Sequence, residues 1–331
     1  MRKSIVPLVV LLLASMNRAE ELPCTVQLPV SVLLPDGALI RNLNRDQIVV
    51  KGKNGPLPTT GLVTDKAPRR IVLVAETGER VSAPARTITA NVLSEIVSKA
   101  RPEDSFALLT ARGPLRQVHF GENRDVLQNV INDLAAKAPG KSPSPDLLDA
   151  LQQAVAWLQP HQRGDAILVL TVGLEDDRSR TKYPKVRDAL GEAGIRLFGF
   201  QLGGIVSGFI HEEWTPLPGG PGVRPSASMV ANREGLDSLS RESGGFIFVE
   251  DTSSPVQAYK LTDERLKLIK GRGRQLYKAA AEFYLLTATS FAKDFSIDVS
   301  DEVRKQLPAA MVAYPRWSPA CPAAGPGNPI P

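Results

Sequence analysis

The sequence is poor in the residues that build soft metal sites and disulfide frameworks, with two Cys and three His among 331 residues. The histidines (His119, His161 and His211) lie far apart and show no ligand spacing, which argues against a zinc site. Aromatic residues are also scarce, at 5%. Hydrophobic residues at 43% and charged residues at 23% are nevertheless ordinary for a globular protein, so a sizeable core is expected.

Sequence motifs of the common enzyme classes are missing as well. His211-Glu212-Glu213 does not match the metalloprotease pattern H-E-x-x-H. The serines on either side of Pro143 lack a nucleophile-elbow pattern. The glycines at 271 and 273 fit no phosphate-binding loop and are interpreted as turns. We therefore expect no enzyme activity; a hydrolase that uses the carboxylates between Gly203 and Met229 has almost no support.

The first residues have the pattern of a secretory signal. Basic Arg2 and Lys3 precede an apolar stretch, Ile5–Ala14, that is too short to span a bilayer. We predict a signal peptide over residues 1–19, with an uncleaved anchor as the alternative. Cleavage would remove Arg2, Lys3 and Arg18 and no acidic residue, so the net charge would fall from +5 to +2. The mature chain is then expected to be secreted or periplasmic, with no membrane insertion and no nucleic-acid partner.

The two cysteines, Cys24 and Cys321, lie at opposite ends of the predicted mature chain. In an exported protein an even count permits a disulfide that ties the termini together. Two independent free thiols are almost equally compatible with the sequence, because sequence alone does not show proximity. Both alternatives stay open at this stage.

Hydrophobic patterning divides the chain into five segments. After the signal come an N-terminal β segment (24–65), an α/β domain (66–255), a C-terminal helix and β segment (256–318) and a disordered Pro-rich tail (319–331). Within the α/β domain, strands predicted at 71–75, 106–110, 115–120, 166–171, 195–202 and 246–250 alternate with helices at 83–100, 125–137, 146–158, 183–193 and 233–243. Ser144 is the predicted N-cap of the third of these helices, with Pro145 at its first helical position.

Strands that alternate with helices indicate a mostly parallel sheet covered on both faces. The predicted fold class is therefore α/β: a doubly wound, mostly parallel, Rossmann-like sheet. A small β appendage built from the N- and C-terminal segments is expected beside it, because the N-terminal β segment is too small to be stable alone.

Several segments, taken in order, resemble the von Willebrand factor A domain. They are the strand that ends at Ala75, R-P-E-D-S-F-A-L-L-T from Arg101, R-E-S-G-G-F-I-F-V from Arg241, E-F-Y-L-L-T-A-T-S from Glu282, and A-Y-P-R-W at the end. The chain is most similar to an exported, A-domain-related group typical of acidobacteria. The resemblance covers most of the mature chain and implies a protein–protein interaction module.

The resemblance also draws attention to a missing metal site. In the metal-binding members, three loops at the carboxyl edge of the sheet supply Asp, Ser and Thr oxygens to Mg²⁺ or Mn²⁺. The first Asp position falls on Ala75, the two Ser positions on Thr77 and Glu79, the Thr position of the second loop on Pro145, and the last Asp position on Val172. The resemblance therefore implies a degenerate metal-ion-dependent adhesion site, and we expect no metal and no cofactor. The alternative is an Mg²⁺ or Mn²⁺ site with relocated ligands among Glu76, Glu79, Glu175 and Asp176.

The predicted function is that of an exported, non-enzymatic interaction module that does not depend on metal; the alternative is a divalent-metal-dependent adhesion module. The partner is expected to be a protein whose identity the sequence does not give. Its contact surface is expected along the rim at the carboxyl ends of the strands and in the insertion that contains Trp214. The candidate residues are Glu76, Thr77, Glu79, Ser142, Ser144, Glu175, Asp176 and Trp214.

Overall fold

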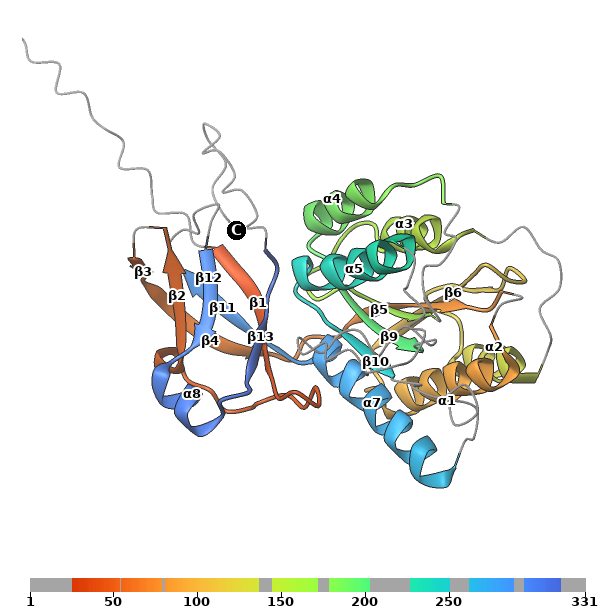
Figure 1. Cartoon of the computed structure of the whole chain (residues 1–331), viewed down its shortest axis with the longest axis horizontal. Coiled ribbons are helices and arrows are strands. Elements are labelled where there is room, and N and C mark those ends of the chain that lie inside the picture. Colours follow the sequence, from red (N-terminus) through yellow and green to blue (C-terminus); the bar gives the residue numbers. More distant parts are fainter. Residues whose placement is uncertain are drawn as a thin grey trace, which may run out of the picture.

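The computed structural model of the chain describes residues 26–53, 55–78, 81–136, 145–171, 179–202, 227–250, 262–288 and 295–316. These residues form an α/β unit built on a parallel sheet and, beside it, a smaller unit made mainly of β-strands (Figure 1). No helix within these ranges is both long and apolar enough to cross a bilayer.

The central sheet has six strands in the order β10-β9-β8-β5-β6-β7. All neighbours are parallel except β7, which pairs antiparallel with β6. Every residue of β8 is buried, as the unbroken apolar sequence of a strand covered on both faces requires. The strands are β5 (Arg70–Glu76), β6 (Ser105–Ala111), β7 (Gln117–Val118), β8 (Ala166–Thr171), β9 (Arg196–Leu202) and β10 (Ile247–Glu250).

Alternate residues of β5 face two different helix layers, as the two-residue period of a strand dictates. Ile71, Leu73 and Ala75 pack in the core beneath α1, α2 and α7. Val72 and Val74 pack in the core beneath α3, α4 and α5. Figure 1 shows these two layers on opposite faces of the sheet. The helices are α1 (Ala83–Lys99), α2 (Arg124–Ala136), α3 (Leu147–Trp157), α4 (Tyr183–Ala193), α5 (Ala227–Glu242) and α7 (Asp263–Ala281).

The β unit consists of two small sheets with strand orders β13-β1-β11-β4 and β12-β2-β3. β1 lies between β11 and β13 and is antiparallel to both. Four of its strands precede the α/β unit: β1 (Val26–Leu33), β2 (Ile48–Gly52), β3 (Gly55–Leu57) and β4 (Thr59–Asp65). The rest follow it: β11 (Phe283–Ala288), β12 (Phe295–Val299), α8 (Asp301–Gln306) and β13 (Met311–Ala313). The predicted fold class, with an appendage made from both ends of the chain, is confirmed.

Four local predictions differ from the structure. The glycines at 271 and 273, interpreted as turns, lie inside helix α7, where the helix continues through both. The strand predicted at 115–120 is reduced to β7, Gln117–Val118. The helix predicted from Ser144 and Pro145 begins at Leu147 with Asp146 as its N-cap, because the Pro145 carbonyl instead accepts a hydrogen bond from the Arg112 N–H at 2.9 Å. Helix α8 was not predicted, although its N-cap Ser300 accepts a hydrogen bond from the Val303 N–H as such caps do.

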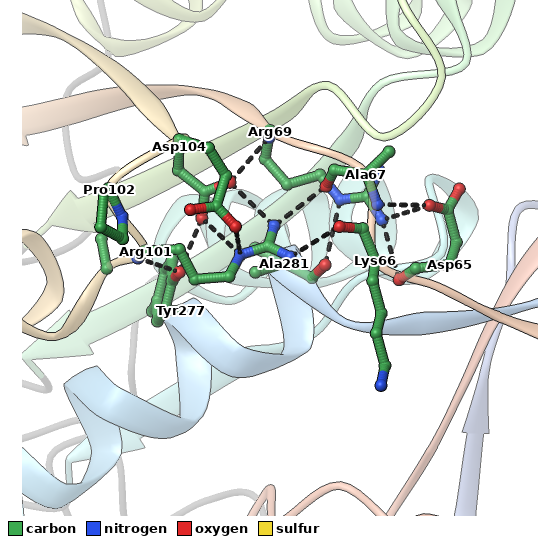
Figure 2. Close-up of polar contacts among 12 residues, drawn as sticks. Asp65, Lys66, Ala67, Arg69, Arg101, Pro102, Asp104, Tyr277 and Ala281 are labelled. Carbon is green, nitrogen blue, oxygen red and sulfur yellow. Dashed lines mark hydrogen bonds and ion pairs between the residues drawn. The ribbon is translucent and has the colours of Figure 1, made fainter.

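A buried polar network joins the two units near the amino ends of the central strands (Figure 2). The Arg69 side chain pairs with Asp65 of β4 at 3.0 Å and donates to the Ala281 carbonyl at the end of α7. The Asp104 carboxylate accepts hydrogen bonds from the Arg101 side chain, the Arg69 N–H and the Tyr277 hydroxyl. Because these groups come from β4, α7 and the two loops that enter β5 and β6, the network fixes how the units meet.

A second buried arginine, Arg196, lies in the same junction at the start of β9. Its guanidinium donates to the Ser31 hydroxyl of β1 and to the carbonyls of Ala279 and Ala280. Arg196 and Arg69 both lie over the Phe283 ring, 4.1 and 4.3 Å from its centroid. Burial, together with the nearby charge of Arg69, lowers the pKa of Arg196 to about 9.

Candidate interaction site at the carboxyl edge of the sheet

The strand order changes direction between β5 and β8. From β5 the chain crosses through α1 to β6 on one side, and from β8 it crosses through α4 to β9 on the other. In open α/β sheets, ligands bind in the crevice outside the carboxyl ends of the strands at such a point. Glu76 and Thr171 are the last residues of these two strands, so the crevice begins with their side chains.

Glu76 places a buried carboxylate at this position, since only 3% of the residue is exposed. The Thr171 hydroxyl donates to Glu76 Oε2 at 2.5 Å, and Arg112 Nη1 donates to Glu76 Oε1 at 3.3 Å. A buried carboxylate is costly unless its oxygens are hydrogen-bonded or paired with a cation. Both conditions are met here by side chains of the chain itself.

Arg112 supplies the positive charge of the site. It follows β6 directly, and its guanidinium is 3.3 Å from Glu76 and 3.4 Å from Asp146. Its backbone has a φ of +55°, which is uncommon for a residue other than glycine. Asp146 is the N-cap of α3, but its carboxylate does not cap the helix and pairs with Arg112. The guanidinium therefore lies between two carboxylates at the switch point of the sheet.

Two glycines allow the turns after β5 and β6 to pack closely. A Cβ at Gly78 would lie 2.3 Å from the Arg112 carbonyl oxygen, and one at Gly113 would lie 2.2 Å from Thr77 Oγ1. Thr77 is 5% exposed, and among the described residues its hydroxyl has no hydrogen-bond partner. The two turns thus form a tight pair that holds Arg112 over Glu76.

On the far side of α3, its first turn is tied to residues 179–181. The Ser179 hydroxyl oxygen accepts from the N–H groups of Leu148 and Asp149 at 3.0 and 3.2 Å. The Asp149 carboxylate accepts in turn from the N–H groups of Arg180 and Thr181. Burial alone would raise the pKa of Asp149, but the hydrogen bonds from Thr181 and Arg180 outweigh it and lower the pKa. The rim on this side of the site is therefore braced.

Of the residues predicted from the sequence, the structure brings Glu76 and Thr77 to the site. Ala75, the position matched to the first metal-binding Asp, is buried in the core beneath α1. The remaining candidates lie outside the described residues: Glu79, Ser142, Ser144, Glu175, Asp176, Trp214, Cys24 and Cys321.

Sequence reasoning missed Arg112 and Thr171, whereas Asp146 ends the stretch 142–146 that the sequence places on the expected rim. A usable signal was the Arg112-Gly113 pair directly after an apolar strand, which places a charge at the edge of the sheet. Within the described ranges, no three His, Cys, Asp or Glu side chains gather as a metal site would require. The described histidines lie elsewhere: His119 stacks with Trp157, and His161 follows α3 near the opposite edge of the sheet.

Comparisons with known proteins give weak structural similarities only. A von Willebrand factor type A protein from Catenulispora acidiphila aligns with a TM-score of 0.41 and 8% identity, over 76% of this chain and 50% of that protein. An aerotolerance-related membrane protein from Bacteroides fragilis aligns with a TM-score of 0.38 and 14% identity, over 60% and 98%. Proximal thread matrix protein 1 from the mussel byssus, with a zinc-occupied MIDAS motif, gives a TM-score of 0.42 and 14% identity, over 69% and 50%.

No family model matches the sequence, and no curated protein matches it. The fold class therefore follows from the strand order and the helix layers of this chain itself.

Proposed function

We propose that the chain is an exported module, similar to a von Willebrand factor A domain, that binds another protein without a divalent cation and without catalysis. The observation that carries the proposal is the guanidinium of Arg112 between Glu76 and Asp146 at the switch point of the sheet. The signal-like residues 1–19 support export, and the resemblance of the sequence supports the interaction role.

Charge is the reason for cation independence. A carboxylate cluster attracts Mg²⁺ when its negative charge is unbalanced, because that charge offsets the loss of water from the ion. Here Arg112 already balances Glu76, and the Thr171 hydroxyl donates to the other Glu76 oxygen. An incoming cation would meet a fixed positive charge and would have to break both interactions.

The partner is expected to contact the rim around this cluster. Its described part consists of Thr77, Arg112 and Asp146 together with the braced residues 179–181. The proposed rim also includes Glu79, Ser142, Ser144, Glu175, Asp176 and Trp214, which lie outside the described residues.

One observation favours a second candidate, the divalent-metal-dependent adhesion module. Glu76, Asp146, Thr77 and Thr171 together offer only oxygen donors, the type that Mg²⁺ and Mn²⁺ prefer. If the Arg112 side chain swung out of the cluster, these oxygens would form the core of a relocated site.

Manganese titration separates the two candidates. We expect no Mn²⁺ binding by calorimetry up to millimolar concentrations for the unaltered chain, and capture of envelope proteins that EDTA leaves unchanged. Arg112→Met removes the internal cation and is expected to gain Mn²⁺ binding. Arg116→Met is the matched control, because Arg116 lies in the same turn but pairs with Asp133. Mn²⁺ binding to the unaltered chain, or capture lost in EDTA, would replace the proposal with the metal-dependent one.

Export and the absence of catalysis have their own tests. Mass measurement of the protein from an envelope fraction should show removal of residues 1–19. A substrate screen for hydrolases should show no turnover, and any turnover that the Arg112→Met variant loses would contradict a pure binding role.

A further inference from the structure

A cleft of about 720 Å³ lies between the two units, near the amino ends of the central strands and away from the site described above. One wall is strand β1, through Gln27, Leu28 and Pro29. The other walls are the turn before β8 (residues 161–164) and the end of α4 (residues 187–194). Pro315, just beyond β13, also lines the cleft. The segment that follows β13 therefore lines this cleft at Pro315.

Beside this cleft, one edge of β1 has no strand partner among the described residues. β11 pairs with residues 26–30 of β1, whereas β13, on the other side, pairs only with residues 31–33. Pro29 has no N–H to offer, and Arg163 Nη1 donates to Gln27 Oε1 at 2.7 Å, so the open edge is only partly protected. Such an edge accepts an extended segment of chain.

The register of β13 points to the segment that fits. Leu33, Val32 and Ser31 face Met311, Val312 and Ala313 in antiparallel order. Continued without a break, this register sets Pro315 opposite Pro29 and residue 317 opposite Gln27. The position of Pro315 in the cleft with Pro29 agrees with that continuation.

Side-chain alternation indicates which residue would enter the cleft. Pro315 lines it, whereas Tyr314 and Arg316 line a separate pocket of about 330 Å³. The Pro315 backbone is bridged to Ser243, and the Arg316 N–H donates to the Glu242 carbonyl at 2.8 Å. In an extended chain the next residue on the Pro315 side is residue 317, which is a tryptophan.

We propose that Trp317 and the residues after it occupy this cleft within the same molecule and cover the open edge of β1. The Leu28 side chain is buried in the core of the β unit, so the half-buried Pro29 ring supplies the apolar surface that suits an indole ring, and the guanidinium groups of Arg163 and Arg187 line the same cleft. Attachment at Arg316 keeps the segment at a millimolar effective concentration, so even a weak contact is occupied. The segment would act as a built-in competitor for any extended peptide that binds this edge.

The test uses the full chain with Trp157 and Trp214 replaced by Phe, which leaves Trp317 as the remaining tryptophan. A reducing agent removes any effect of a Cys24–Cys321 bond. We expect blue-shifted Trp317 emission and a several-fold smaller acrylamide quenching constant than in the urea-unfolded chain, both independent of protein concentration. Ala193→Arg, which fills the cleft from the end of α4, should restore quenching. Lys185→Ala, on the same helix but outside the cleft, should change nothing.

Each outcome either supports or overturns the proposed position of Trp317. Exposed emission in the native chain overturns the proposal, and concentration-dependent shielding assigns the cleft to a second copy. Shielding that Ala193→Arg leaves unchanged places Trp317 elsewhere and also overturns it. Gln27→Pro provides a second variant, read by circular dichroism for folding and by quenching for docking, in case Ala193→Arg does not fold.

Discussion

Replacing Asp104 with Asn should lower the free energy of unfolding by about 3 kcal/mol, because Asp104 is the buried acceptor of the network that joins the two units. The Asp104 side chain is fully buried and accepts four hydrogen bonds: two from the Arg101 side chain at 2.8 and 3.1 Å, one from the Arg69 N–H at 2.8 Å and one from the Tyr277 hydroxyl at 2.6 Å. An amide in its place keeps the shape, loses the negative charge and turns an N–H₂ group toward donors.

The magnitude follows from the cost of leaving a charge unpaired. Removing one partner of a buried ion pair costs about 3–5 kcal/mol in free energy of unfolding. The Arg101 side chain is 25% exposed and also donates to the carbonyls of Lys66 and Ala67, so its charge stays partly compensated. The lower end of that range of free energies therefore applies. We expect a loss of about 3 kcal/mol, which is roughly a hundredfold in the folded-to-unfolded ratio.

Urea unfolding followed by circular dichroism measures this loss, and the neighbouring Glu103 provides the control. Glu103 is 3.8 Å from the Arg101 Nε and half-exposed, so Glu103→Gln should cost under about 0.5 kcal/mol. The reasoning fails if Asp104→Asn costs no more than Glu103→Gln. It also fails if Asp104→Asn and Tyr277→Phe combine additively, since residues in one network should couple.

Three further predictions concern other groups. Burial and the hydrogen bond to Asp104 raise the pKa of Tyr277 to about 12 from an ordinary value of 10. The contribution of Tyr277 to stability is therefore complete below pH 10 and is lost as the pH rises toward 12. The difference in free energy of unfolding between the unaltered chain and Tyr277→Phe, measured in urea, should shrink over that interval. Arg196→Met should change the free energy of unfolding by less than about 1 kcal/mol or raise it, since the described hydrogen-bond partners of that buried cation are a hydroxyl and two carbonyls, none of them charged; a loss of several kcal/mol would show that the charge itself is required. If the chain is exported as proposed, a Cys24–Cys321 bond is expected, because Gln27 and Pro315 line one cleft; non-reducing peptide mapping should find the linked pair, and two free thiols would contradict it.

Much of the α/β unit was predictable because its strands are buried on both faces. An unbroken apolar run such as Ala166–Thr171 admits few other interpretations, and the structure makes it β8. The start of α3 was placed wrongly because Ser144-Pro145 has the pattern of a helix start, whereas Pro145 and Asp146 both turn toward Arg112. That preference arises from a tertiary contact, which hydrophobic periodicity along the chain does not encode.

The candidate site was predictable only in part, for a related reason. Glu76 and Thr77 follow a strand that the sequence identifies, so their place at the edge of the sheet was foreseeable. Arg112 lies at the end of a different strand, and its pairing with Glu76 depends on the adjacency of β5 and β6 and on the close approach that Gly78 and Gly113 permit. Sequence spacing between residues 76 and 112 carries no sign of that approach.

The interleaving of early and late strands in the β unit constrains how the polypeptide matures. β1 and β4 are both made before the α/β unit, yet they flank β11, which is made after it. During synthesis or translocation, the edges of β1 and β4 that pair with β11 therefore stay unpaired until residues 283–288 have been made or translocated. Such early strands are targets for mispairing, so we expect the emerging chain to need protection by a holding chaperone that the finished protein does not.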